Sequence, residues 1–146
     1  MAKAKILVVE DEQEIAEALQ VNLEGAGYQV FLAADGLEAL RTFDREQPDL
    51  VTIDLMVPTI SGFRLVQLMK RPRPHGPVPI IVITALSFEE GEDAARAGAD
   101  DFVTKPLDPD ELVRRVGFVL GKRAAPGYRI PADYPNGHRA HGLSLD

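Results

Sequence analysis

Short apolar runs alternate with amphipathic stretches along this chain. The runs that predict strands lie at 6–9, 29–33, 50–54, 80–83 and 102–104. Most of them are apolar without a break, which is typical of strands whose two faces are both buried. Alternation of such strands with helices predicts a parallel sheet covered on both faces. We therefore expect an α/β fold with a doubly wound, five-stranded parallel sheet.

The stretches between the strands carry helix signals. Asp35 offers an N-cap to the second helix with Glu38 as its capping-box partner, and Asp108, Pro109 and Glu111 predict the start of the last helix in the same way. Apolar residues at helical spacing predict the buried faces of four helices. These residues are Ile15, Ala16, Leu19 and Leu23; Leu37, Leu40 and Phe43; Phe63, Val66 and Met69; and Leu112, Val116, Val119 and Leu120.

Two internal segments are less regular. Residues 71–77 are rich in proline and predict a surface loop. The helix expected at 87–97 has a capping box at Ser87 and Glu90, but Gly91 lies in its interior. Because few apolar residues are available to bury it, we expect this helix to be short and mobile.

The chain is predicted to form one domain. Its 146 residues are enough to bury a substantial core. After Gly121 the composition shifts to Gly, Pro, His and polar residues without periodicity, so residues 124–146 predict a Gly- and Pro-rich tail with no output domain visible.

Charge and composition exclude several classes of function. The net charge of -7 argues against direct binding of nucleic acid, and the absence of cysteine excludes disulfide scaffolds and thiolate metal sites. The longest apolar stretch is far shorter than the ~20 residues that span a bilayer, and no signal-peptide core follows the N-terminus. We expect a cytoplasmic protein without a membrane partner.

Polar residues follow four of the predicted strands. Glu10 and Asp11 end the first strand, Asp54 the third, Thr84 the fourth and Lys105 the fifth. The carboxyl ends of parallel strands share one edge of the sheet, so these groups can converge. The carboxylates would suit Mg²⁺, and the hydroxyl and ammonium groups would suit the oxygens of a phosphoryl group.

Each residue has a structural interpretation when taken alone. Asp54 would cap the following turn, and residues 10–12 would be acids at a helix N-terminus. Thr84 would be an ordinary strand residue and Lys105 a surface lysine. Their joint position, each at the end of a different strand, favours a functional site.

These motifs together resemble the receiver domain of two-component response regulators. The resemblance covers about residues 4–123 and implies a flavodoxin-like fold with strand order 2-1-3-4-5. It is carried by Val8-Val9-Glu10-Asp11-Glu12, Asp54-Leu55-Met56-Val57-Pro58 with Gly62, Thr84-Ala85, Gly98-Ala99-Asp100-Asp101-Phe102 and Lys105-Pro106.

The resemblance implies a phosphoacceptor and a Mg²⁺ site. Asp54 would accept a phosphoryl group from the phosphohistidine of a sensor histidine kinase. Asp11 and Asp54 would bind Mg²⁺ directly, Glu10 through water, and Met56 through its backbone carbonyl. The protein would then be a regulatory phosphoacceptor that catalyses only its own phosphoryl transfer and slow dephosphorylation.

The resemblance also implies a switch. Lys105 would pair with the phosphoryl oxygens, Thr84 would hydrogen-bond one of them, and the ring of Phe102 would move inward with Thr84. The peptide bond between Lys105 and Pro106 would be cis. The face made by residues 87–97, the fifth strand and the last helix would contact a downstream protein or an output domain.

Many receivers with this acidic pair precede a winged-helix DNA-binding domain and form homodimers through that same face. The acidic helix at 87–97 does not fit the usual ion pairs across such a dimer. Asp100, Asp101, Glu111 and Arg115 remain as candidates for them.

Three other functions are alternatives to this one. A Mg²⁺-dependent phosphatase with an aspartyl-phosphate intermediate would need a second acid at the position of Met56. Flavin binding would need a phosphate loop where residues 10–12 place acids. The third alternative is a receiver used as a constitutive scaffold and never phosphorylated.

Overall fold

The computed structural model describes residues 3–74, 76–85, 93 and 95–124. Nine elements have defined bounds: β1 Lys5–Val9, α1 Gln13–Gly25, β2 Gln29–Ala33, α2 Gly36–Glu46, β3 Leu50–Asp54, α3 Gly62–Met69, β4 Ile80–Thr84, β5 Asp101–Thr104 and α5 Pro109–Ala124.

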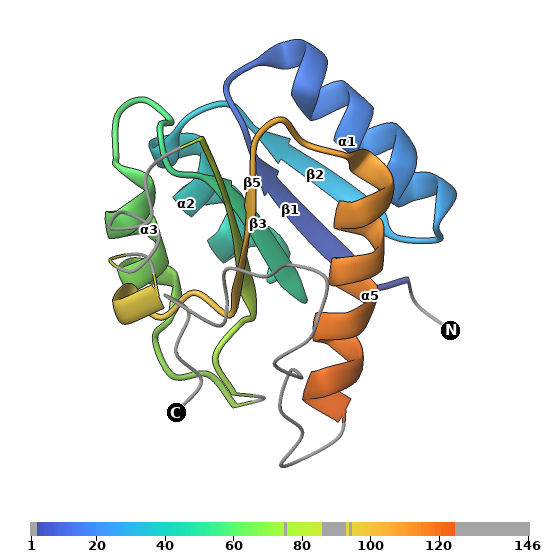
Figure 1. Cartoon of the computed structure of the whole chain (residues 1–146). Coiled ribbons are helices and arrows are strands. Elements are labelled where there is room, and N and C mark those ends of the chain that lie inside the picture. The colour runs from blue at the N-terminus through green and yellow to red at the C-terminus, as the bar shows by residue number, and fades with distance from the viewer. Residues whose placement is uncertain (1–2, 75, 86–92, 94, 125–146) are drawn as a thin grey trace.

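The strands form one parallel sheet in the order β2-β1-β3-β4-β5, which confirms the predicted topology (Figure 1). β1 lies between β2 and β3, so the chain changes direction across the sheet at β1. In doubly wound sheets, ligands bind beyond the carboxyl ends of the strands at such a reversal. The ends of β1 and β3 therefore mark the edge at which a site is expected.

Helices cover both faces of the sheet (Figure 1). Alternate residues of the central strands point to opposite faces, so each strand contributes to two cores. Val8 and Ile81 pack with α1 and α5, whereas Leu7, Ile53 and Val82 pack with α2 and α3. Burial on both faces explains the unbroken apolar runs in the sequence.

The predicted helix faces are largely confirmed, with one error in α2. Leu37 is 44% exposed, and the buried positions of this helix include Ala39 and Phe43. Leu37 lies in the first turn of the helix, where its backbone N–H donates to Thr59 Oγ1 at 3.0 Å.

The N-cap predicted at Asp108 and the helix start predicted at Pro109 are confirmed, whereas the capping-box role predicted for Glu111 is wrong. Asp108 Oδ1 does accept a backbone N–H at the start of α5, but from Asp110 at 3.0 Å. The carboxylate of Glu111 instead accepts from Arg115 Nη2 at 2.8 Å, one turn along the helix. A buried arginine outcompetes the helix terminus because its charge needs a partner.

The four candidates for ion pairs across a dimer are engaged within the chain. Arg115 and Asp101 are both almost fully buried, and Arg115 Nη1 lies 3.1 Å from Asp101 Oδ2. Glu111 bonds to the same arginine, and Asp100 accepts from Lys70 Nζ. These contacts lie within one chain, and the part that these residues take in a dimer stays a prediction.

Several predictions fall on residues outside the described part. The capping box at Ser87 and Glu90, most of the helix at 87–97 and the tail from 125 onward lie there, although 93 and 95–97 are helical. α5 continues to Ala124, where the tail was expected to begin. Within the described residues, no helix is long and apolar enough to cross a membrane.

One buried hydroxyl in the central strand gives a stability prediction. Thr52 of β3 is fully buried between Val8 and Ile81, and its Oγ1 has no hydrogen-bond partner among the described residues. An unsatisfied buried hydroxyl costs about 1–3 kcal/mol. We expect Thr52→Val to raise the free energy of unfolding by about 1 kcal/mol in urea titrations. A lower unfolding midpoint would contradict this expectation.

Candidate active site at the carboxyl edge of the sheet

Asp54 is the last residue of β3 and only 3% exposed. Its Oδ2 accepts a hydrogen bond from Lys105 Nζ at 2.8 Å, and its Oδ1 accepts from the backbone N–H of Met56 at 2.9 Å. Both carboxylate oxygens are therefore oriented. A carboxylate held in this way at the end of a buried strand is a candidate nucleophile.

Glu10 lies beside Asp54 and is also buried. Its Oε2 accepts from the backbone N–H of Glu12 at 3.2 Å, whereas its Oε1 is buried without a hydrogen-bond partner among the described residues. Burial, with a contribution from the charge of Asp54, raises the pKa of Glu10 to about 7. Two buried carboxylates side by side repel each other, which favours a cation beside them.

Asp11 completes an acidic cluster. One carboxylate oxygen from each of Glu10, Asp11 and Asp54 lies within 4.8 Å of the others, and Asp11 is the exposed member. Hard carboxylate oxygens are the ligands that Mg²⁺ prefers, and this ion keeps several waters, which an exposed ligand permits. The residues therefore fit Mg²⁺. The backbone carbonyl of Met56, the fourth predicted ligand, stays a prediction.

Lys105 connects the acidic residues. Its Nζ lies 2.8 Å from Asp54, 3.5 Å from Glu12 and 3.8 Å from Glu10. Burial lowers the pKa of Lys105, but the hydrogen bond and charge of Asp54, together with the two glutamates, outweigh it and raise the pKa above its usual value. The lysine is thus a permanent cation at neutral pH. The pairing of Lys105 with Glu12 was not among the contacts predicted from the sequence.

Backbone geometry places Lys105 near the site. Its N–H donates to Thr84 O at 2.9 Å, which continues the pairing of β4 with β5. The peptide bond between Lys105 and Pro106 is cis, as predicted. Both side chains of the predicted switch are buried, with Thr84 1% and Phe102 3% exposed. The ring of Phe102 already lies in the core, and its movement stays a prediction.

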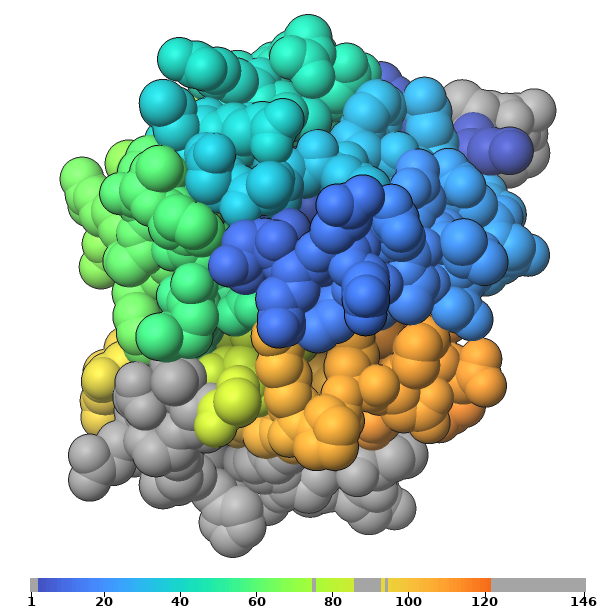
Figure 2. Space-filling view, turned by 90° about the horizontal axis from the view of Figure 1, so that it is seen from above, coloured from blue at the N-terminus to red at the C-terminus, as the bar shows by residue number. Residues whose placement is uncertain are grey.

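The segment that follows Asp54 passes close to α3. A Cβ atom built on Gly62 would lie 2.5 Å from Leu55 Cα, so only glycine permits this approach. Ser61 caps α3 by accepting from Arg64 N–H at 3.2 Å. Figure 2 shows the face onto which the segments after β1 (blue), β3 (green) and β5 (orange) open side by side.

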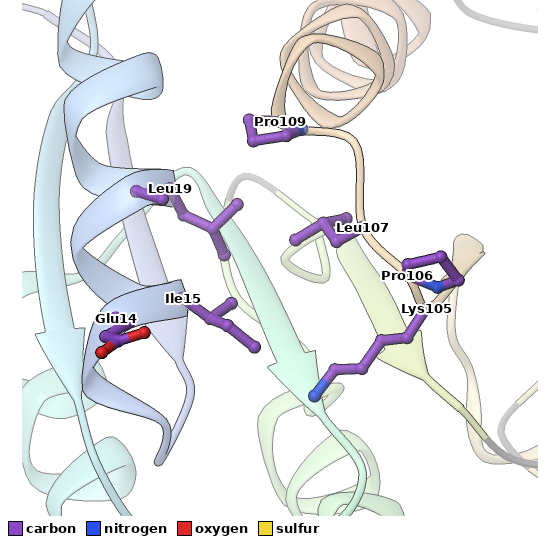
Figure 3. Close-up of a pocket in the computed structure, with 8 residues that line it drawn as sticks. Glu14, Ile15, Leu19, Lys105, Pro106, Leu107 and Pro109 are labelled. Atoms are coloured by element: carbon purple, nitrogen blue, oxygen red, sulfur yellow. The ribbon is translucent and has the colours of Figure 1, made fainter.

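An apolar groove adjoins Lys105. It has a volume of about 290 Å³ and lies between α1 and the segment that joins β5 to α5. Figure 3 shows Ile15 and Leu19 on the helix side facing Leu107 and Pro109, with Lys105 at the end of the groove.

Comparisons with known proteins agree with this geometry. The family model of the response regulator receiver domain matches residues 6–117. A probable transcriptional regulator, ycf27 of Porphyridium aerugineum, is 44% identical over 82% of this chain and 49% of its own length. The alkaline phosphatase synthesis transcriptional regulatory protein PhoP of Bacillus subtilis is 38% identical over 91% of this chain and 56% of its own. The chain spans about half the length of these relatives.

Solved structures agree as well. A CheY-like receiver domain protein from Methanospirillum hungatei superposes with a TM-score of 0.79 at 28% identity, covering 86% of this chain and all of that one. The BeF3-activated DrrB receiver domain superposes with a TM-score of 0.74 at 34% identity, covering 82% of this chain and 99% of that one. Both have the flavodoxin-like fold described above. From its fold, its site and these relatives, the chain belongs to the response regulator receiver domain family.

Proposed function

We propose that this chain is a phosphoryl-accepting switch, in which Asp54 takes a phosphoryl group from the phosphohistidine of a sensor histidine kinase in the cytoplasm. The observation that carries the proposal is the pairing of the buried Asp54 carboxylate with Lys105, beside two further carboxylates. This arrangement combines an oriented nucleophile, the Asp54 carboxylate, with one cation, the Lys105 ammonium group, and with carboxylate ligands for a second cation.

The transfer forms one bond and breaks one. An oxygen of Asp54 attacks the phosphorus atom while the bond from phosphorus to the donor nitrogen breaks, and the leaving imidazole takes up a proton. Glu10, Asp11 and Asp54 would hold Mg²⁺, and when bound this ion offsets the negative charge of the carboxylates and the phosphoryl group. Hydrolysis of the acyl phosphate by water would return the free carboxylate slowly.

The chain's own residues would stabilise the new charge. Phosphorylation adds a charge of about -1.5 to -2 next to Glu10, which is already buried. Lys105, 2.8 Å from Asp54, would move from the carboxylate to a phosphoryl oxygen, and the Thr84 hydroxyl would donate to another. Because Lys105 N–H bonds to Thr84 O, the two would respond together.

Both partners would bind close to these elements. The groove between α1 and Leu107 is apolar and ends at Lys105, so a helix of the kinase docked there would bring its phosphohistidine to Asp54. A downstream protein or output domain would bind the face that includes β5 and α5, whose position depends on Thr84 and Phe102.

The test is the intact mass of the protein after incubation with acetyl phosphate, with and without Mg²⁺. We expect the addition of one phosphoryl group that depends on Mg²⁺. A mass that stays unchanged under conditions that modify another receiver would favour the scaffold alternative.

Lys105→Met should slow this phosphoryl uptake by about 100-fold, because removing one donor that stabilises developing charge typically has an effect of this size. The initial rate of mass gain measures it. Lys3→Met, an exposed lysine away from the site, is the matched control and should react like wild type. Equal rates of phosphoryl uptake in Lys105→Met and Lys3→Met would show that Lys105 does not contribute to the transfer.

A further inference from the structure

We infer that Thr59 and Asp35 are positioning residues, which hold the segment after Asp54 against the N-terminus of α2 and so fix the geometry of the acidic site. This segment, residues 55–60, contains Met56, whose backbone N–H orients Asp54 Oδ1. The inference depends on the proposed function only in one of its tests, the measurement of Mg²⁺ binding.

Thr59 adopts a backbone conformation that its side chain disfavours. Its φ is 72°, in the left-handed region that β-branched residues rarely occupy. Such a conformation costs of the order of a few times RT and persists only where the surroundings enforce it. The surroundings of Thr59 must therefore supply a specific restraint.

Hydrogen bonds to α2 supply this restraint. Thr59 Oγ1 accepts from the backbone N–H of Leu37 at 3.0 Å and donates to Asp35 Oδ1 at 3.4 Å. The backbone N–H of Gly36 donates to Pro58 O at 2.9 Å. Three consecutive residues at the start of α2 thus bind the segment, and Thr59 shares the capping carboxylate with Glu38 N–H.

Close packing adds to the hydrogen bonds. A Cβ atom on Gly36 would lie 2.6 Å from Ile60 Cβ and 2.7 Å from Ile60 O, so the backbones of the segment and of α2 touch directly. At its other end the segment is held to α3, because Gly62 N–H donates to Leu55 O at 3.2 Å. The Met56 amide lies between these two attachments.

The consequence concerns a site that Thr59 does not touch. If the attachment to α2 is lost, residues 55–60 gain freedom, and the Met56 N–H no longer fixes the carboxylate rotamer of Asp54. Groups that orient metal ligands from outside the coordination shell typically change metal affinity by about 10- to 100-fold. We expect the lower end of this range, since Lys105 still holds Asp54 Oδ2.

Thr59→Val tests the inference, because it removes the hydroxyl and keeps the β-branched shape. We expect about tenfold weaker Mg²⁺ binding by isothermal titration calorimetry. We also expect faster hydrogen exchange of the Met56 amide in the metal-free protein. Asp35→Ala should reproduce both effects.

Ser61→Ala is the matched control. It also removes one hydroxyl that accepts a backbone N–H at a helix start, but that helix is α3, so the attachment to α2 stays intact. Ser61→Ala should leave Mg²⁺ affinity and Met56 exchange close to wild type.

The outcomes separate the two claims. The inference would be overturned if Thr59→Val kept the wild-type rate of Met56 amide exchange and the wild-type Mg²⁺ affinity. It would also be overturned if Thr59→Val and Ser61→Ala changed these two quantities equally. Absence of Mg²⁺ binding in wild type would count against the proposed function, and the exchange of Met56 would still decide the role of Thr59.

Discussion

Asp54→Asn is expected to abolish phosphoryl uptake from acetyl phosphate, measured as intact mass. An amide is no longer a nucleophilic carboxylate, yet its oxygen can still accept from Met56 N–H or from Lys105, so the fold should be kept. The loss should be complete, because among the carboxylates of the cluster only Asp54 is both buried and held through both oxygens.

Asp49→Asn is the control for this result. Asp49 directly precedes β3, at the opposite end of the strand from Asp54, and accepts from Lys5 N–H through Oδ2 at 2.7 Å. The same substitution there should leave uptake unchanged. Phosphoryl uptake by Asp54→Asn at the wild-type rate would show that another residue is the acceptor.

Arg115→Ala is expected to lower the free energy of unfolding by about 3–5 kcal/mol, the range for breaking a buried ion pair. The guanidinium bonds to both oxygens of Asp101 at 3.2 and 3.1 Å and to Phe102 O at 3.4 Å, and the side chain of Asp101 is fully buried. Without Arg115 this carboxylate keeps the Phe102 N–H at 2.8 Å but loses its cation.

Urea unfolding followed by circular dichroism measures this effect. Arg114→Ala removes an exposed arginine from the preceding position of α5 and should change stability by no more than about 0.5 kcal/mol. The double variant Asp101→Leu with Arg115→Met should recover much of the loss, since an apolar pair has no charge to desolvate. If Arg115→Ala is as mild as Arg114→Ala, the pair does not stabilise the fold.

The sheet and the acidic site could be predicted from sequence because each follows from local pattern. Apolar runs, most of them unbroken, identified the five strands, and the polar residues after four of them had to lie at the same edge of a parallel sheet. The shared edge alone was enough to predict that Asp54 and Lys105 come together. The distance of 2.8 Å between Lys105 Nζ and Asp54 Oδ2 could be learned only from the structure.

What could not be predicted depends on contacts between distant segments. Arg115 directly follows Arg114 on the last helix, and the sequence pattern alone indicates a surface charge. Its burial depends on Asp101 of β5, which lies against it in the fold. Glu111 fits a capping box in the sequence, but its carboxylate accepts a hydrogen bond from Arg115 instead. The role of Thr59 requires the approach of the segment after Asp54 to α2, which no short-range pattern encodes.

Chemical mapping of the phosphoryl group identifies the residue that accepts it. After incubation with acetyl phosphate and Mg²⁺, borohydride reduces an aspartyl phosphate to homoserine, and tandem mass spectrometry of the peptides then locates the reduced residue. We expect reduction at Asp54 and at no other acid. Reduction at Asp11 or Glu10 instead, or a phosphoryl group that resists borohydride, would contradict it.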